Sequence, residues 1–371
     1  MFGRASSKYF KPRGLLGISL YTVSGTMIPM GFKDRFPIIA ALFIIALVLV
    51  GEVIVTVDSR DSFSSSIAVQ GDSVEITMDS HGSHIYRAVA LDGTFGIPER
   101  VCVYFDTDYV SAAATGVSST GGRPLDERYY VEQMHDTLKV RGIDYSEIVG
   151  AKGLADIMGK DGDGIAVIVI SGSLPDTVYD GTADSKIFDW MESGGRLYWI
   201  GGILGKFISH TDGLETVENG TTLFLGSECI DDEVSRGYDM IENGFRDALY
   251  IQSNLTTFSI DVSKLPAGTD YLSMGFTDGK RSSIVTVKEG DGAVCVIGGE
   301  YTIRQRIDLA QLVASGISPD TEIVGIADGT VNGTVKETIA KADSVYITMG
   351  GFYPVYCQNH EVDRCSSATP V

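Results

Sequence analysis

Several polar residues follow directly after apolar runs typical of buried strands, and their position makes them the first candidates for chemistry. In a sheet of parallel strands, ligands bind beyond the carboxyl ends of the strands. The residues predicted to lie at that edge are Asp106, Asp108, Ser171, Ser173, Gly202, Lys206 and Glu300. Asp106 or Asp108 together with Glu300 could form the carboxylate pair that hydrolysis of a glycosidic bond requires. The sequence therefore predicts a ligand-binding rim, with Lys206 adding a cation.

Other patterns are poorer matches to known chemistry. Asp161 begins a stretch, DGDG, that is similar to the start of a calcium loop, but residue 172 is a glycine where such a loop needs Glu. The acidic stretch from Glu228 to Glu233 could hold Ca²⁺, although a solvated loop is the simpler interpretation. Neither G-x-S-x-G nor a glycine-rich nucleotide motif occurs around these residues. We therefore predict no catalytic residue, no metal site and no cofactor.

The elements that must position these residues alternate between strand and helix. Short apolar runs predict strands over 100–106, 145–149, 164–170, 196–200 and 292–298. Segments with helical spacing between them predict helices over 125–141, 151–159, 185–193 and 303–315. Connections of helical length predict an α/β fold with a doubly wound, mostly parallel sheet. The more polar stretches 220–225, 257–262, 271–276 and 283–288 are predicted as short strands, and the chain after residue 321 as a small β annex.

Three local patterns resemble the class I glutamine amidotransferase-like fold, a flavodoxin-like α/β superfamily, over about residues 100–316. They are IVISGSLP at 168–175, FDWMESGGRLYWIGG at 188–202 and GDGAVCVIGGE at 290–300. Membrane-anchored archaeal surface proteins that carry such domains resemble this chain in the same way. The resemblance implies a G-x-C-x-G turn after the fourth strand, with a reactive thiolate at its tip.

The residues that the resemblance would make catalytic are absent from this chain. The matching turn is Gly201–Gly205, and Ile203 occupies the position of the nucleophile. The family's His-x-Glu matches residues 298–300, which leaves Glu300 without its histidine. The resemblance therefore implies a catalytically degenerate domain, a pseudoenzyme.

A stretch near the N-terminus predicts a membrane anchor. Residues 37–57 carry a single charge, Glu52, and a helix of that length spans a bilayer. Residues 1–35 contain six basic side chains and one acidic side chain, whereas the rest of the chain contains 23 basic and 48 acidic ones. The positive-inside rule then predicts a cytoplasmic N-terminus and an acidic extracytoplasmic body. A cleaved signal peptide is the alternative.

The remaining predictions concern the domain organisation and the covalent modifications. We predict a cytoplasmic tail (1–35), a transmembrane helix (36–57), a linker with a β-hairpin (58–99), the α/β domain (100–318) and the annex (319–371). The sequons predict glycosylation at Asn219, Asn254 and Asn332. Cys357 and Cys365 could form a disulfide outside the cell, whereas Cys102 and Cys295 lie in apolar runs and Cys229 is left single.

Two functions are compatible with these features. The first is a single-pass, membrane-anchored cell-surface glycoprotein that binds or assembles without catalysis, with other envelope proteins or glycans as partners. The second is an extracytoplasmic hydrolase of glycosidic or amide bonds that uses the rim carboxylates. The net charge of −20 makes nucleic acid an unsuitable partner in either case.

Overall fold

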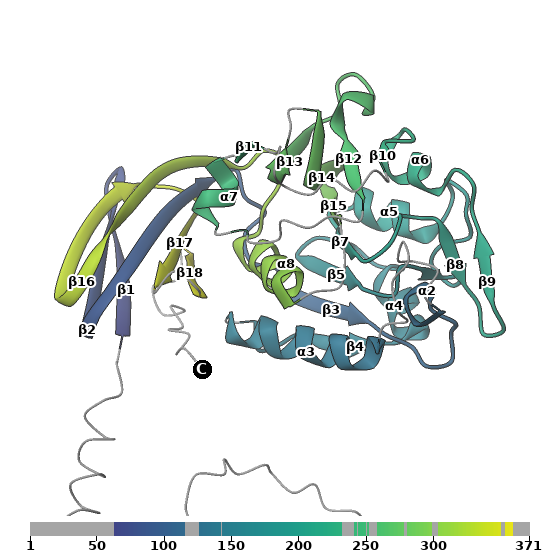
Figure 1. Ribbon diagram of the computed structural model, residues 1–371, viewed down its shortest axis with the longest axis horizontal. Helices are drawn as coiled ribbons and strands as arrows, with labels where there is room; N and C mark the ends of the chain where they lie inside the picture. The colour runs from purple at the N-terminus through teal and green to yellow at the C-terminus, as the bar shows by residue number, and fades with distance from the viewer. Residues whose placement is uncertain are drawn as a thin grey trace, which may run out of the picture. The chain divides into compact units, whose positions relative to one another are not determined.

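The computed structural model describes residues 63–115, 126–141, 143–231, 241–242, 244–249, 251, 258–277, 280–298, 303–349 and 353–358. The described residues form two large sheets, with helices packed against one of them (Figure 1). The predicted anchor, residues 36–57, lies outside the described residues. Among the described residues, no helix is both long enough and apolar enough to cross a bilayer.

The larger sheet has ten strands and contains the apolar runs. Its parallel half consists of strands in the order β15–β7–β5–β3–β4. Their bounds are β3 Arg100–Tyr104, β4 Glu147–Val149, β5 Ile165–Val169, β7 Arg196–Ile200 and β15 Gly292–Ile297. Alternate residues of β5 face opposite sides of the sheet, and each side is covered by a hydrophobic cluster. Because both faces are buried, every position in such a strand is apolar.

The other half of this sheet is antiparallel, so the prediction of a mostly parallel sheet is wrong. The antiparallel strands are β10 Ile230–Asp231, β11 Ile241–Glu242, β12 Ser259–Asp261, β13 Tyr271–Thr277 and β14 Arg281–Glu289. β14 joins β15 through a two-residue turn in which Gly290 has φ 59°. A turn this short can connect only antiparallel neighbours, and the sheet is therefore mixed.

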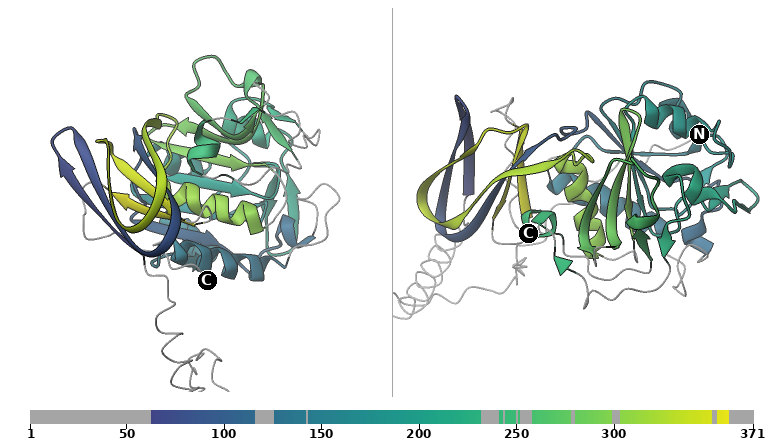
Figure 2. Two further views of the ribbon diagram at one scale, coloured as in Figure 1. Left: turned by 60° about the vertical axis from the view of Figure 1, so that its left-hand side comes forward. Right: turned by 90° about the horizontal axis from the view of Figure 1, so that it is seen from above.

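Helices cover both faces of the mixed sheet (Figure 2). α3 (Glu127–Val140) and α8 (Ile303–Ser315) pack on one face and contact each other. α4 (Ala151–Ile157), α5 (Lys186–Glu192) and α6 (Gly220–Leu225) pack on the other. The shorter α2 spans Ala112–Thr115, and α7 spans Gly244–Ala248. The 3₁₀ turn η1 (Val262–Lys264) follows β12.

The residues after β7 adopt a different structure from the one predicted. Residues 220–225 form helix α6 and not a strand, because Gly226 has φ 70° and donates its N–H to the Thr222 carbonyl at 2.9 Å, which ends the helix. A small third sheet, which the sequence did not predict, lies beside it. Its strands are β6 Leu174–Pro175, β8 Phe207–Ser209 and β9 Leu214–Thr216.

The second large sheet is a five-stranded antiparallel structure and is more extensive than the small annex expected. Its strands are β1 Phe63–Gln70, β2 Ser73–Asp92, β16 Glu322–Ala340, β17 Ser344–Met349 and β18 Tyr353–Gln358. The predicted hairpin forms β1 and the start of β2, which then continues to Asp92 along β16. Val89 and Leu91 of β2 belong to the same hydrophobic cluster as α8, so this sheet shares a core with the mixed sheet.

Candidate functional site

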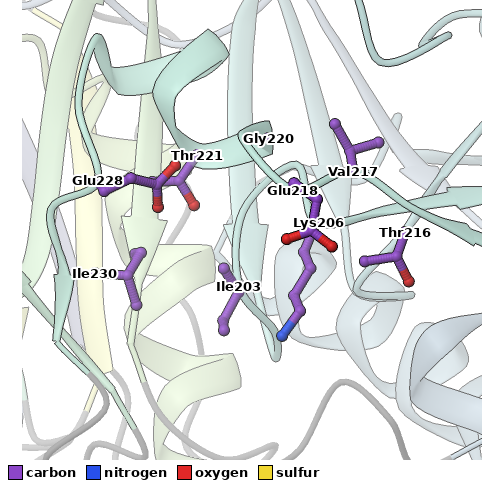
Figure 3. Close-up of a pocket in the computed structure, with 9 residues that line it drawn as sticks. All are labelled: Ile203, Lys206, Thr216, Val217, Glu218, Gly220, Thr221, Glu228 and Ile230. Atoms are coloured by element: carbon purple, nitrogen blue, oxygen red, sulfur yellow. The ribbon is translucent and has the colours of Figure 1, made fainter.

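A pocket of about 260 Å³ opens at the carboxyl end of β7, in the turn where the sequence placed a missing nucleophile (Figure 3). It is formed by that turn, by β9 and the residues after it, by the start of α6 and by the approach to β10. The lining residues are Ile203, Lys206, Thr216, Val217, Glu218, Gly220, Thr221, Glu228 and Ile230. The pocket therefore lies at the predicted rim of the sheet, beside β7.

Two glycines allow the floor of this pocket to form. Gly205 has φ 71°, a left-handed conformation that side chains disfavour. A Cβ added to Gly220 would lie 2.0 Å from the carbonyl oxygen of Gly205, so the start of α6 can pack on the turn only without a side chain. The Tyr179 hydroxyl also donates to the Gly205 carbonyl at 2.9 Å. The turn is consequently held through its backbone, and its Ile203 side chain lines the pocket.

The polar side chains of the pocket carry charges of both signs. Lys206 Nζ lies 5.6 Å from the centre of the Phe207 ring, and within the described part of the chain it has no carboxylate oxygen at ion-pair distance. Glu228 accepts a hydrogen bond from the Thr222 hydroxyl at 2.7 Å. Glu218 is exposed at the pocket. One ammonium and two carboxylates therefore line the same cavity without neutralising one another.

The apolar part of the lining comes from Ile203, Val217 and Ile230. Figure 3 shows the Ile203 side chain between Glu228 and Ile230 on one side and Lys206 on the other. Ile203 offers no atom that can attack a substrate. The Thr221 hydroxyl donates to the Leu204 carbonyl at 3.1 Å and is used in holding the turn. The arrangement can bind and orient a polar ligand, but it contains no activated nucleophile of the Ser, Cys or Thr type.

Of the predicted rim residues, Lys206 is the one that lines this pocket. Asp106 instead caps α4, since its Oδ2 accepts the Ala151 N–H at 2.8 Å and its Oδ1 accepts the Asp108 N–H at 2.9 Å. Asp108 is exposed, and the Gly202 carbonyl accepts from the Trp199 indole at 2.7 Å. Glu300 lies outside the described residues, so its pairing with Asp106 or Asp108 stays a prediction.

The serines at the rim hold the fold together. Ser171 and Ser173 are fully buried, and the Ser171 hydroxyl donates to the Ser173 carbonyl at 2.5 Å. The Ser173 hydroxyl accepts the Ala112 N–H at 3.2 Å and lies 3.3 Å from the Ser209 hydroxyl. These bonds fasten the segment after β3 to β5 and β8. Buried and satisfied hydroxyls of this kind are structural.

A second polar cluster lies beside the pocket and was missed in the sequence. His210 Nδ1 lies 2.9 Å from Asp176 Oδ2, and its Nε2 lies 3.4 Å from Glu215 Oε2. The hydrogen bond with Asp176, supported by Glu215, raises the pKa of His210. Burial and a hydrogen bond with Asp176 raise the pKa of Tyr109. These residues are distant in sequence, and only the pairing of β6, β8 and β9 brings them together.

The acidic stretch from Glu228 to Glu233 contributes Glu228 to the pocket, where the residue is exposed, so a solvated loop stays a prediction. Asp231 ends β10, and the rest of the stretch lies outside the described residues. Within the ranges that the structure describes, no three His, Cys, Asp or Glu side chains are placed to hold a metal ion.

The modification sites are only partly described. Asn219 is exposed between two pocket residues, and Asn332 is exposed on β16, whereas Asn254 lies outside the described residues. Glycosylation stays a prediction at all three. Cys102, Cys229 and Cys295 are buried free thiols, as predicted. The described residues contain no disulfide. Cys365 and the side chain of Cys357 lie outside the described part.

The chain was compared with known proteins after the geometry was established. No family model matches it, and no curated protein matches it. The solved structures that match include a β-galactosidase from Rahnella sp. R3 (16 % identity, 57 % of this chain, 30 % of that one, TM-score 0.36). They also include a β-galactosidase from Halorubrum lacusprofundi (16 % identity, 61 % of this chain, 32 % of that one, TM-score 0.36). A third is the cytoplasmic protein STM1381 from Salmonella typhimurium LT2 (11 % identity, 58 % of this chain, 97 % of that one, TM-score 0.35).

The mixed sheet of this chain corrects the expected resemblance to a doubly wound, mostly parallel fold. The matching structures named above and others among the matches are glycosidases and cytoplasmic proteins, and none of these is a class I glutamine amidotransferase. The chain spans only 30–37 % of the first three structures that it matches. At these identities and TM-scores the likeness assigns no activity. The function must therefore be argued from the pocket itself.

Proposed function

We propose that this chain binds a carbohydrate in the pocket at the end of β7. The observation that carries the proposal is the lining itself, in which ionised and hydroxyl side chains surround a small apolar surface. Carboxylates and hydroxyls can bond to sugar hydroxyls, while Ile203, Val217 and Ile230 can pack against the C–H face of a sugar ring. The cavity of about 260 Å³ is smaller than the roughly 300–1,000 Å³ typical of drug-sized ligands, which suits a single sugar residue.

Binding without covalent catalysis is the form of this proposal that the turn supports. The position after β7 that could present a nucleophile carries Ile203, and the nearby hydroxyl of Thr221 is engaged with the Leu204 carbonyl. The buried serines of the rim are also engaged in hydrogen bonds within the protein. A ligand held here would meet groups that bind it and, among them, no activated hydroxyl or thiol that could form a covalent intermediate.

Hydrolysis of a glycosidic bond is the second candidate, because Glu218 and Glu228 line the same pocket. Glycosidases use two carboxyl groups, about 5–5.5 Å apart in retaining enzymes and about 6.5–9.5 Å apart in inverting ones. One of the two must act as an acid, and the other must act as a base or nucleophile. The candidate pair of carboxyl groups for hydrolysis is therefore Glu218 and Glu228, in place of a pair that includes Asp106.

The test is a titration of the full chain with a panel of neutral and acidic monosaccharides, followed by calorimetry or by ligand-observed NMR. We expect saturable binding that Glu228→Gln weakens about three- to thirty-fold, because an amide oxygen accepts a weaker hydrogen bond than a carboxylate does. Glu322→Gln, an exposed change on β16, is the matched control and should bind as the wild type does. Absence of binding to every sugar in the panel contradicts the proposal.

Incubation with oligosaccharides distinguishes the two candidates. Release of reducing ends by the wild type, and its loss in both Glu218→Gln and Glu228→Gln, would establish the hydrolase. Binding without release is the result expected if the pocket only binds its ligand.

A further inference from the structure

Lys206 is the feature of the pocket that the binding of a neutral sugar leaves unexplained. Its ammonium group lines the cavity, yet in the described part of the chain it forms no ion pair. Other lysines with a nearby carboxylate do form such pairs. Lys288 lies 3.1 Å from Asp320, and Lys336 lies 2.8 Å from Glu75. Glu218 and Glu228 line the same cavity as Lys206, and neither forms an ion pair with its ammonium group.

We infer that the ligand is an acidic sugar, a hexuronate whose carboxylate binds Lys206. The inference rests on the proposed function and adds the class of sugar to it. A charged ligand group facing an ammonium in a concave site forms a shorter and stronger hydrogen bond than a neutral hydroxyl does. The carboxylate of the ligand would be the ion-pair partner that Lys206 lacks among the described residues.

The two glutamates determine how such a ligand is oriented. Glu228 lies across the pocket from Lys206, beyond the Ile203 side chain (Figure 3). A ligand carboxylate at the Glu228 end would be repelled, whereas sugar hydroxyls there can donate to the Glu228 oxygen atoms. The acidic group therefore binds at Lys206, and the hydroxyl-bearing edge of the ring binds at Glu228.

The overall negative charge of the chain has little effect on this preference. Fixed charges more than about 8 Å away are largely screened at physiological ionic strength. The charges that matter are the three in the pocket, where both glutamates are exposed and Glu218 lies near Lys206 in the view of Figure 3. Removing the charge of Glu218 should strengthen the binding of an acidic sugar and leave that of a neutral sugar nearly unchanged.

The experiment compares glucuronate with glucose, two sugars that differ by a carboxylate, and uses acetate as the anion alone. In the full-length wild type we expect glucuronate to bind about three- to ten-fold more tightly than glucose, and the difference to shrink as salt is raised. Lys206→Met keeps the length of the stem and should abolish the difference. Lys160→Met, at an exposed position away from the pocket, should preserve it. Glu218→Gln should enlarge it.

Each of the other outcomes contradicts either the inference or the proposed function. If glucose binds as tightly as glucuronate, or if the preference survives Lys206→Met, the inference is wrong and the proposed function stands. If acetate binds as tightly as glucuronate, the site takes a small anion and not a sugar acid. If neither sugar binds the wild type, the proposed function fails and the inference fails with it. Unfolding curves of Lys206→Met show whether the variant is folded.

Discussion

Two charged clusters lie close together in the chain and use their charges in opposite ways. In the cluster of Asp176, His210 and Glu215, each charge faces a partner, and the imidazole connects three short strands. In the pocket, Lys206, Glu218 and Glu228 remain unpaired with one another. Paired charges at a surface stabilise a local conformation, whereas unpaired charges in a cavity are available to a ligand. The first cluster is therefore structural, and the second is the candidate site.

The largest effect is expected from the backbone contact that shapes the pocket. Gly220→Ala places a Cβ 2.0 Å from the Gly205 carbonyl oxygen, and the neighbour is backbone that cannot move aside cheaply. We expect the free energy of unfolding to fall by about 1–3 kcal/mol, the usual cost of overpacking. Urea denaturation measures it. Gly213→Ala is the control, because a Cβ there meets nothing within 4 Å. Equal stability of the two variants would show that the close approach is not required.

A half-buried carboxylate elsewhere provides a third kind of charge, which has no ion-pair partner among the described residues and lines no described pocket. Burial, together with repulsion from Glu192, raises the pKa of Glu289 to about 7. A raised carboxyl pKa stabilises the fold below about pH 4.5, and that contribution is lost as the pH rises through about 7. We expect Glu289→Gln to remove on the order of 1–2 kcal/mol of this pH dependence.

Stability curves at pH 5 and pH 8 for the wild type and Glu289→Gln provide the measurement. Glu322→Gln, an exposed glutamate, should leave the pH dependence unchanged. An identical slope in wild type and Glu289→Gln would contradict the account of this group.

Breaking the paired cluster should have a smaller effect. The pKa of His210 is raised by Asp176 and Glu215, so its stabilising contribution is complete below the ordinary value of about 6.5 and disappears as the pH rises through the raised value. His210→Gln should cost less than about 1 kcal/mol at pH 6 and nothing at pH 9, because the pair is at the surface. His81→Gln, an exposed change on β2, is the control. A loss that is the same at both pH values would mean that packing, not charge, is responsible.

The smallest effect on stability is expected in the pocket itself. Lys206→Met removes a charge that has no ion-pair partner among the described residues, so the free energy of unfolding should change by no more than about 0.5 kcal/mol. Thermal and urea unfolding measure it. A loss comparable with that of Gly220→Ala would place Lys206 in the fold and not in a binding site.

The sequence predicted the parts of the fold whose pattern is local. β7 and α8 occupy 196–200 and 303–315 as expected, because a run of four apolar residues after Arg196 or a helical spacing ended by Gly316 needs no distant partner. Residues 220–225 were predicted as a short polar strand or an excursion, but they form helix α6, whose first residue, Gly220, packs against Gly205. The antiparallel half of the mixed sheet and the length of β2 depend on partners that the local pattern does not reveal.

The site was predictable only where it follows directly from a strand. Lys206 was found because it comes after β7, and Glu228 was noticed as part of an acidic stretch. Glu218 and His210 gave no signal, because the pairing of β8 with β9 that positions them is not visible in the local sequence. Asp106 and the serines had the right position, but hydrogen bonds within the protein use their polar atoms.

The claim that unpaired charges mark a sugar-binding pocket is tested most directly by titrating the full chain with glucuronate, in the wild type and in Lys206→Met. The account predicts saturable binding to the wild type that weakens about three- to ten-fold in the variant, whose stability is unchanged. Equal binding of glucuronate to both proteins, or binding to neither, would contradict it.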